Sequence, residues 1–523
     1  MDYLIHHMLR ASAERRPDAE ALVHGSVRLS YENVQRRVAG LGEGLRRAGI
    51  ERGDRIGIYL DASVPQALSI FGVSAAGGVY VPINGLLFPE QVGHIASDCG
   101  MKALITTSEK LASVIATIQS MSSIKFLVVV GDSEKCDARV PCLDFDELCD
   151  TKPADDLNDR RIEKDLAAIL YTSGSTGKPK GVMLSHAQVM AGSSIVSTYL
   201  DITAEDRILA VLPFSFDAGM NQLMTAWQQG GALVLINFVF AREVVQVLLK
   251  ERITGLAGVP TFWSLMAQPS SSLHKHALPH LRYITNTGGA MPQPVLGTLR
   301  RLLPKTKVFL MYGLTEAFRS TYLPPEELDR RPTSMGKAIP DTEILVVRED
   351  GSLCMPGEVG ELVHRGPTVS MGYWGQPELT ARVLRPHPFL PPELGDVERV
   401  CYSGDYVKMD EEGFLYFVGR RDTMIKSSGF RISPTEVEEV LFKSGMVKAA
   451  AVIGVPDEVL GQTIKAFVVG RDGEPIQIEQ LREFCAGSMP RHMIPKSVEL
   501  LADMPKTPSG KVDYPALRRR EGL

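Results

Sequence analysis

The sequence predicts an α/β protein: a large N-terminal domain of helix-covered, mostly parallel sheets plus a β region, followed by a small mobile α+β C-terminal domain. Three observations support this fold class. The chain has 523 residues, which is too many for one hydrophobic core. Short continuous apolar runs alternate with helix-length segments, which is typical of buried parallel strands covered by helices. After about residue 340, apolar runs alternate with turn residues, which favours antiparallel strands.

The elements follow from these patterns in chain order. Residues 9–50 are expected to be helical and amphipathic, interrupted at Tyr31 and ended by Gly49. The helix expected after Ser433 has the Ser-x-x-Glu spacing of a capping box, with proline at its first position. The expected strands cover residues 55–60, 103–105, 126–130, 167–170, 208–212, 233–236, 255–258, 308–311, 343–347 and 360–363. The domain boundary is placed at Asp422, giving domains 1–421 and 422–523.

Composition excludes several classes of protein. The net charge is −5 and no Lys/Arg block is present, so a nucleic-acid partner is not expected. The seven cysteines form no Cys-x-x-Cys pair, which argues against a disulfide framework or zinc site and favours the cytoplasm. No signal peptide is visible, and the longest apolar run, 231–240, is too short to span a membrane.

The most informative motif is Tyr171-Thr-Ser-Gly-Ser-Thr-Gly-Lys-Pro-Lys-Gly181, which follows an apolar strand. Its glycines let the backbone approach an anion, and its hydroxyls, amides and lysines can bind phosphate oxygens. It is not a Walker A loop, because Thr172 replaces the required glycine and Pro179 follows the lysine. A flexible linker is the alternative, but linkers do not usually join two apolar segments. The predicted ATP-binding residues here are Thr172, Ser173, Gly174, Ser175, Thr176, Gly177, Lys178 and Lys180.

This motif resembles the phosphate-binding signature of the adenylate-forming superfamily, which comprises AMP-forming acyl-CoA synthetases, adenylation domains of non-ribosomal peptide synthetases and beetle luciferases. Further signatures follow in order, so the resemblance covers almost the whole chain. It implies an enzyme that activates a carboxylic acid with ATP and Mg²⁺ to an acyl-adenylate and then transfers the acyl group to a thiol.

The resemblance assigns roles to two further motifs of the N-terminal domain. Met311-Tyr-Gly-Leu-Thr-Glu-Ala317 resembles the second nucleotide motif, in which Tyr312 packs on adenine, Thr315 contacts the α-phosphate and Glu316 coordinates Mg²⁺. A hard cation that bridges phosphates suits a carboxylate ligand. Asn286-Thr-Gly-Gly-Ala290 resembles the segment beside the adenine and the acyl pocket. The nucleotide contacts implied by these motifs are Gly289, Ala290, Met311, Tyr312 and Gly313.

Three C-terminal motifs complete the resemblance. It implies that Asp405 binds the ribose, Arg420 contacts the nucleotide and Asp422 is the hinge. Lys426 and Gly429 would lie along the thiol channel, with a plain surface charge as the alternative for Lys426. Pro505-Lys-Thr-Pro-Ser-Gly-Lys511 resembles the loop of the catalytic lysine. Lys511 is therefore the catalytic candidate and Lys506 its nearest competitor.

The same roles suggest how the reaction would proceed. A carboxylate that attacks the α-phosphate brings two anions together, so the enzyme must offset repulsion and orient the reactants. Lys511 can bridge them, and no general base is required because the acid is already ionised. His186, five residues beyond the loop, is accordingly expected to be structural.

The acid and its acceptor are less sharply defined. Phe216-Asp217 resembles the acyl-pocket motif of amino-acid adenylation domains, whose carboxylate pairs with the substrate ammonium. The alternative is that Asp217 caps a helix beginning at Ala218. The predicted pocket residues are Phe216, Asp217, Met220, Gly288, Gly289 and Leu314.

We therefore expect an α-, β- or imino acid, transferred to the phosphopantetheine of a separate carrier protein. The runner-up is an AMP-forming acyl-CoA ligase that uses coenzyme A and a non-amino acid. A luciferase-like oxygenase and a catalytically silent nucleotide-binding regulator are the alternatives from other classes. A silent regulator should lack Lys511 or Glu316, and both are present.

Overall fold

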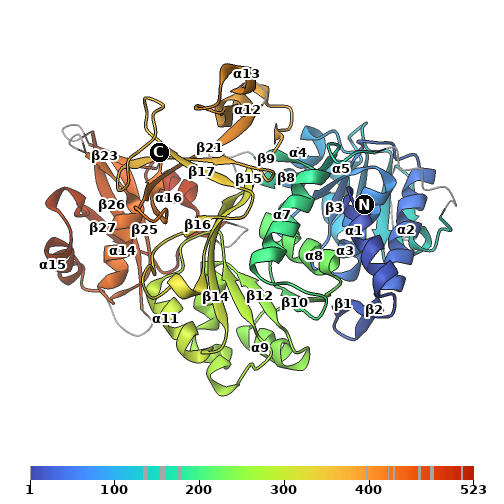
Figure 1. The fold of residues 1–523 in the computed structure, drawn as a ribbon, viewed down its shortest axis with the longest axis horizontal. Helices are drawn as coiled ribbons and strands as arrows, with labels where there is room; N and C mark the ends of the chain where they lie inside the picture. Colours follow the sequence, from blue (N-terminus) through green and yellow to red (C-terminus); the bar gives the residue numbers. More distant parts are fainter. Residues whose placement is uncertain are drawn as a thin grey trace. The chain divides into compact units, whose positions relative to one another are not determined.

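The computed structural model describes residues 2–132, 139–153, 161–172, 179–395, 398–421, 423–427, 430–457, 461–471, 476–507 and 511–523. It separates into two compact units (Figure 1). Unit 1 comprises Met1–Glu343 and His364–Cys401, and unit 2 comprises Ile344–Val363 and Tyr402–Leu523. Unit 2 thus includes segments that precede the expected domain boundary at Asp422. That boundary was inferred from a hinge motif and stays a prediction, because Asp422 lies outside the described residues.

The first sheet of unit 1 has eight strands, in the order β19-β9-β8-β4-β3-β5-β6-β7. Its central strands run parallel, while β8 and β9 form an antiparallel pair. The strands are β3 (Arg55–Tyr59), β4 (Val79–Pro82), β5 (Ala103–Thr107), β6 (Phe126–Val130), β7 (Cys142–Asp144), β8 (Leu166–Thr172), β9 (Lys180–Ser185) and β19 (Gly372–Tyr373).

The second sheet of unit 1 has nine strands, in the order β16-β15-β14-β13-β12-β10-β11-β1-β2. It is parallel from β14 to β1, with antiparallel strands at both ends. The strands are β1 (Glu20–His24), β2 (Val27–Ser30), β10 (Arg207–Ala210), β11 (Ala232–Leu235), β12 (Gly255–Gly258), β13 (Tyr283–Asn286), β14 (Lys307–Leu314), β15 (Ala317–Leu323) and β16 (Lys337–Ala338). The predicted mostly parallel, helix-covered sheets are confirmed.

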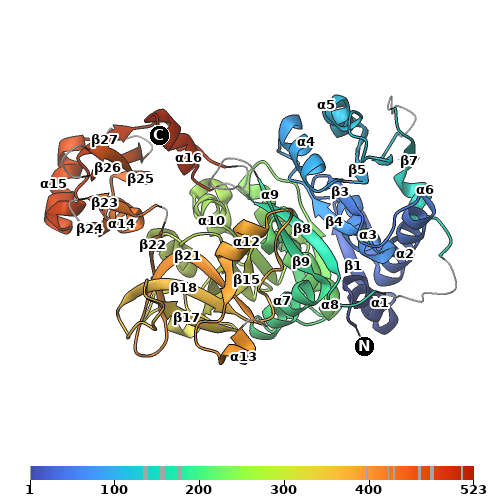
Figure 2. The same ribbon diagram turned by 90° about the horizontal axis from the view of Figure 1, so that it is seen from above.

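Helices fill the space between the two sheets. Helix α3 contacts β4 and β1, and helix α7 contacts β8, β9 and β15, so both touch strands of each sheet (Figure 2). The helices of unit 1 are α1 (Ile5–Arg15), α2 (Tyr31–Arg47), α3 (Val64–Ala76), α4 (Pro89–Asp98), α5 (Ser108–Ile118), α6 (Phe145–Cys149), α7 (His186–Tyr199), α8 (Asp217–Gln229), α9 (Ala241–Lys250), α10 (Pro260–Met266), α11 (Gln293–Leu302), α12 (Pro377–Val383) and α13 (Pro392–Gly395).

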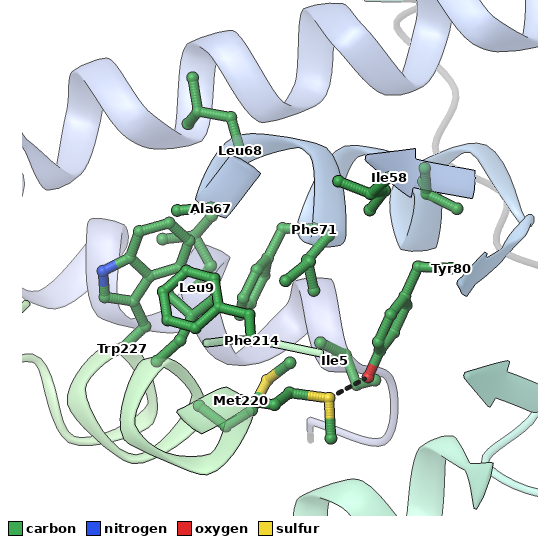
Figure 3. Packing of buried hydrophobic residues seen from close by; sticks show 14 of the residues in the cluster. Ile5, Leu9, Ile58, Ala67, Leu68, Phe71, Tyr80, Phe214, Met220 and Trp227 are labelled. Atoms are coloured by element: carbon green, nitrogen blue, oxygen red, sulfur yellow. Dashed lines mark hydrogen bonds between the residues drawn. The ribbon is translucent and has the colours of Figure 1, made fainter. Parts of the chain in front are cut away.

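The largest core cluster of unit 1 joins these helices to both sheets (Figure 3). Trp227 of α8 is fully buried, its ring lies 4.7 Å from that of Phe71, and its indole N–H donates to the Ala21 carbonyl at 3.0 Å. Tyr80 of β4 donates to Met220 Sδ at 3.3 Å. Burying such aromatic side chains stabilises the fold strongly. Helix α8 is therefore held firmly between the sheets.

Unit 2 ends in a small α+β domain, as predicted. Its sheet has the order β24-β23-β26-β25, with β27 beside β26. Helices α14 and α16 both contact β25, and they contribute to separate buried clusters. The elements are β23 (Ile425–Ser427), β24 (Phe430–Ile432), α14 (Pro434–Lys443), β25 (Val447–Asp457), β26 (Gly461–Gly470), α15 (Ile478–Ser488), β27 (Ser497–Leu500) and α16 (Tyr514–Arg520).

The predicted β region is also present. Strands β17 (Glu343–Val347), β18 (Val359–Arg365), β21 (Arg399–Met409) and β22 (Leu415–Arg420) belong to one sheet, together with β20 (Leu384–Pro386). The division between the units falls within β17, β18 and β21. Strands β21 and β22 pair antiparallel, with Asp405 opposite Arg420.

The expectation that residues 9–50 are helical is wrong for residues 20–30. Residues 20–30 form strands β1 and β2, and β1 pairs parallel with β11. Ala21, Leu22 and Val23 are buried, so pairing with a distant strand overrides the local helical pattern. The break at Tyr31 is correctly placed, because α2 begins there with Ser30 as its N-cap. The capped start of α14 is also confirmed, since Ser433 accepts from Glu436 N.

The structure bears on two expectations from the sequence, namely that no segment spans a membrane and that the cysteines form no disulfide framework. Among the described residues, no helix combines the length and apolar character needed to cross a membrane. Of the cysteines that the structure describes, those at 99, 149, 354, 401 and 485 are free, whereas Cys142 is disulfide-bonded. The chain therefore carries a disulfide at Cys142 despite the absence of a Cys-x-x-Cys pair.

A buried carboxyl group in unit 2 makes stability depend on pH. Glu438 of α14 accepts hydrogen bonds from Val452 N at 2.8 Å and from the Tyr514 hydroxyl at 2.7 Å. Burial raises the pKa of Glu438 to about 7, from 4.5, although these hydrogen bonds lower it. The folded state thus binds the proton more tightly than the unfolded state. The stability this group contributes is complete below pH 4.5 and is lost as pH rises through about 7.

We predict that unit 2 loses stability on the order of 2 to 3 kcal/mol between pH 5 and 8, and that Glu438→Gln removes most of this dependence. Hydrogen exchange of amides in β25, corrected for intrinsic rates, would measure it in the full chain. Glu483→Gln, at an exposed position of α15, is the control. An unchanged pH dependence in Glu438→Gln would contradict the assignment.

Candidate functional site

The phosphate-binding motif joins two antiparallel strands. Thr172 ends β8 and pairs with Lys180, which begins β9. Both side chains are half-buried, and Lys180 Nζ lies 6.0 Å from the centre of the Tyr373 ring. The intervening predicted residues Ser173, Gly174, Ser175, Thr176, Gly177 and Lys178 lie outside the described residues.

The second nucleotide motif forms the tip of the β14–β15 hairpin. Met311, Tyr312, Gly313 and Leu314 lie on β14, while Thr315 and Glu316 form the turn. The Glu316 carbonyl accepts from Ser370 N at 2.8 Å, and its Oε1 accepts from the Tyr373 hydroxyl at 2.6 Å. The first bond fixes the backbone at Glu316, and the second orients its carboxylate. The sequence analysis missed Tyr373, because no local pattern links β19 to this hairpin.

Tyr312, the predicted adenine contact, lies beside a neutral histidine. Its ring is nearly parallel to that of His364, at 17° and a centroid distance of 6.0 Å. Burial lowers the pKa of His364 to about 3. Neither ring nitrogen has a hydrogen-bond partner among the described residues. His364 therefore supports Tyr312 by packing and carries no charge at neutral pH.

The segment after β13 places glycines at the surface of unit 1. Gly289 and Ala290 are exposed, Gly288 has a positive φ of 78°, and the Asn286 side chain donates to the Gly289 carbonyl at 2.8 Å. This turn therefore presents open backbone, as the sequence predicts for a segment that borders a ligand.

The predicted acyl-pocket motif is the start of α8. Asp217 is its first residue and is buried, and its Oδ1 accepts from Ala218 N at 2.7 Å. Because the helix begins at Asp217 and its N-cap is Phe216, without a side-chain cap bond, the alternative in which Asp217 caps a helix beginning at Ala218 is wrong. Amine recognition by Asp217 stays a prediction. Met220 packs in the core against Tyr80, and none of the six predicted pocket residues, Asp217 included, lines the cavity described next. Leu314 packs beside the cluster that contains Ala317.

A cavity of about 20 Å³ lies against α8 and is lined partly by Met311 of the nucleotide motif. Three of its polar lining residues, Asn221, Thr225 and Arg319, were not predicted from the sequence. For two of them a signal existed: Asp217, Asn221 and Thr225 are spaced four residues apart, which places them on one face of a buried helix. Arg319 had no comparable signal.

The predicted ribose site in unit 2 has a preformed partner. Asp405 is buried, and its Oδ1 accepts from Arg420 Nε at 2.7 Å across the β21–β22 pair. The structure thus brings together two residues that the sequence assigned separately. Asp422, the predicted hinge, lies outside the described residues.

Lys511, also in unit 2, is exposed at the end of the predicted catalytic loop. Its backbone is fixed by Thr507: Thr507 N donates to the Lys511 carbonyl at 2.7 Å, and Lys511 N donates to Thr507 Oγ1 at 3.2 Å. Lys426 lies on β23, whereas Gly429 lies outside the described residues.

The residues around Glu316 fit the Mg²⁺ that the resemblance implies. Mg²⁺ is typically held by one or two carboxylates together with substrate phosphates. Glu316 supplies one oriented carboxylate, and no cluster of three or more His, Cys, Asp or Glu forms a metal site among the described residues. Glu316 would therefore hold the ion jointly with the nucleotide.

Together, the two helix-covered sheets, the predicted phosphate motif and the oriented carboxylate are the features expected of an ATP-dependent enzyme of the adenylating class. The chain belongs to the AMP-binding enzyme family: the model of this family matches residues 9–374, and that of the AMP-binding enzyme C-terminal domain matches residues 436–511.

Similar proteins support the same class of reaction. Feruloyl-CoA synthase of Amycolatopsis sp is 33% identical over 520 residues, which cover 98% of this chain and 97% of that protein. Tyrocidine synthase 1 of Brevibacillus parabrevis is 29% identical over 519 residues, which cover 98% of this chain but only 44% of that protein. The crystal structure of ATP-bound MatB from Rhodopseudomonas palustris has a TM-score of 0.88 and 26% identity, covering 99% of both chains.

The protein is therefore an AMP-forming ligase that joins a carboxylic acid to a thiol. ATP is its nucleotide substrate.

We predict that Tyr373→Phe lowers the kcat/KM of ATP–pyrophosphate exchange roughly tenfold, because Glu316 loses the hydroxyl that orients its carboxylate. Steady-state exchange at varied ATP would measure this. Tyr416→Phe removes a comparable hydroxyl contact, to Asp410 in unit 2, and should retain wild-type exchange. Equal effects of the two substitutions would argue against a positioning role for Tyr373.

Proposed function

We propose that this ligase activates an amino acid, of the α-, β- or imino type, and transfers it to the phosphopantetheine thiol of a separate carrier protein. The observation that carries the amino-acid proposal is the buried carboxylate of Asp217 at the start of α8, the helix that lines the cavity. A buried carboxylate needs compensating donors, and Ala218 N supplies one of them to Oδ1. A substrate ammonium would add a cationic partner.

The acid-activating step follows from charge. The carboxylate oxygen of the acid attacks the α-phosphorus of ATP, a new phosphorus–oxygen bond forms, and the bond to pyrophosphate breaks. Lys511 would bridge the two anions, and Lys180 at the start of β9 would attract phosphate oxygens. Mg²⁺ held by Glu316 would neutralise charge on the departing pyrophosphate. Tyr312 and the Asp405–Arg420 pair would bind adenine and ribose respectively.

Transfer to the thiol is the second step of the proposal. The thiol sulfur attacks the carbonyl carbon of the acyl-adenylate, a thioester forms, and AMP leaves. Lys426 and Gly429 are the proposed lining of the thiol channel, and Asp422 is the proposed hinge.

Coenzyme A is the second candidate acceptor, with a non-amino acid as substrate. The match to feruloyl-CoA synthase favours it, because this chain covers 97% of that protein but only 44% of tyrocidine synthase 1. Single-turnover transfer from the enzyme-bound adenylate to coenzyme A or to holo-carrier protein would distinguish the two acceptors.

We predict that Lys511→Ala slows adenylate formation by roughly 100- to 1,000-fold, because one preorganised electrostatic contact is lost. Thioester formation from supplied acyl-adenylate should be largely spared. Separate assays of the two half-reactions test this, with Lys506→Ala as the control from the same loop. Equal loss in both half-reactions would overturn the role of Lys511.

We predict that Asp217→Asn lowers kcat/KM for amine-bearing acids about 10- to 100-fold while sparing the matching acids without the amine. Asparagine retains an oxygen that can accept from Ala218 N, so this local hydrogen bond is preserved. ATP–pyrophosphate exchange with α-amino, β-amino, fatty and aryl acids measures the effect. Exchange by the wild type with non-amino acids alone would sink the amine proposal.

A further inference from the structure

The cavity beside α8 has an unusual composition for the interior of unit 1. It lies among α7, α8 and the strands β10 and β12 to β15, and most of its lining is aliphatic or aromatic. Its polar lining residues are Asn221, Gln222, Thr225, Thr285 and Arg319. At about 20 Å³, it has room for one small polar group.

Arg319 brings a buried positive charge to this cavity. It is 5% exposed, and Nη1 donates to Thr287 Oγ1 at 3.0 Å. Among the described residues, its Nε is buried without a hydrogen-bond partner and Arg319 forms no ion pair, and its guanidinium carbon lies 5.7 Å from the centre of the Phe318 ring. A guanidinium cannot shed its proton at physiological pH, so the charge remains. A buried charge without a counterion is costly, which indicates that a ligand supplies the counterion.

The backbone holds Arg319 in place at an energetic cost. Its φ is 55°, a left-handed conformation that is strained for a residue other than glycine. The register of the β14–β15 pair shifts between Tyr312 and Leu314, opposite this residue. A Cβ on Gly313 would lie 2.7 Å from Arg319 N, so only glycine fits there.

Asn221 of α8 adds a second donor to the cavity. It is 3% exposed, and its Nδ2 has no hydrogen-bond partner among the described residues. Gln222 is anchored by a bond from Nε2 to the Leu209 carbonyl at 2.9 Å, and its Oε1 is likewise unpartnered within the described part of the chain. The cavity therefore offers a cationic donor, an amide donor and one acceptor to a small group.

We infer that Arg319 and Asn221 form the far end of the acid pocket and bind a second carboxylate of the substrate. One carboxylate of the acid is activated by ATP, and the other is recognised in this cavity. The inference rests on the proposed acid-activating role of this pocket, but it does not require the amine assigned to Asp217. The competing explanation is a buried water that joins the same three polar groups.

The test is ATP–pyrophosphate exchange by the full-length enzyme with matched acids. Dicarboxylates of three to six carbons are compared with monocarboxylates of equal length, each with and without an amino group. The wild type should prefer the dicarboxylate of the best-fitting length by roughly 10- to 100-fold in kcat/KM, the scale of a charge-assisted hydrogen-bonded pair. This preference should reside mainly in the KM for the acid.

Arg319→Met should abolish that preference by lowering kcat/KM for the dicarboxylate at least tenfold without lowering kcat/KM for the monocarboxylate. The KM for ATP should stay unchanged. Arg319→Lys, which keeps the charge, should restore part of the preference. Arg252→Met is the matched control, because Arg252 is also an arginine with positive φ but is exposed. If Arg319→Met does not fold, two measurements take its place. One is exchange by Asn221→Leu with the same acids, and the other is the thermal shift that each acid alone causes in the wild type.

The outcomes separate the two proposals. Equal use of mono- and dicarboxylates by the wild type would overturn the inference. A dicarboxylate preference that is unchanged in Arg319→Met would overturn it as well. Either result would leave Arg319 as a structural residue bridged by water. Exchange only with dicarboxylates that lack an amine would refute the amine proposal and leave this inference standing. Thermal stabilisation by dicarboxylates but not monocarboxylates, without exchange for any acid, would support the cavity and refute the activation chemistry.

Discussion

The close approach of Gly313 and Arg319 across the β14–β15 hairpin is the constraint on which much of unit 1 depends. Because the backbone of Arg319 occupies the space of a side chain at 313, the two strands are locked in a shifted register. That register places Tyr312 beside His364, puts Glu316 at the turn within reach of Tyr373, and turns Arg319 to the cavity. One hairpin thus carries residues assigned to the nucleotide, the metal ion and the acid.

Much of the fold could be predicted because its strands are short, apolar and regularly spaced. Strands such as β3 and β6 are almost completely buried, so their continuous apolar runs identify them without ambiguity. Strand β1 was not predicted, because Glu20–His24 is short and lies between helical patterns. It is stabilised by pairing with β11, which is far away in the sequence. Periodicity alone cannot distinguish a brief buried strand from one turn of a helix.

In the candidate site, too, some residues could be located from the sequence and others could not. Motifs whose chemistry resides in contiguous residues, such as Tyr312 to Glu316, could be located from sequence. Residues that act through tertiary contacts could not. Tyr373 reaches Glu316 from another sheet, and Arg319 faces the cavity only because of the register shift opposite Gly313. Asn221 is an intermediate case, since its spacing from Asp217 was visible but its burial was not.

The left-handed backbone at Arg319 also bears on how the range of acids accepted by this enzyme can change over evolution. Most replacements at 319 would inherit the strain of a positive φ, whereas glycine would relieve it. Glycine would at the same time leave the volume of a whole arginine side chain open in the cavity that Arg319 lines. The position that we propose to recognise a second carboxylate is therefore also one from which longer, uncharged acids could be reached by a single substitution without added backbone strain.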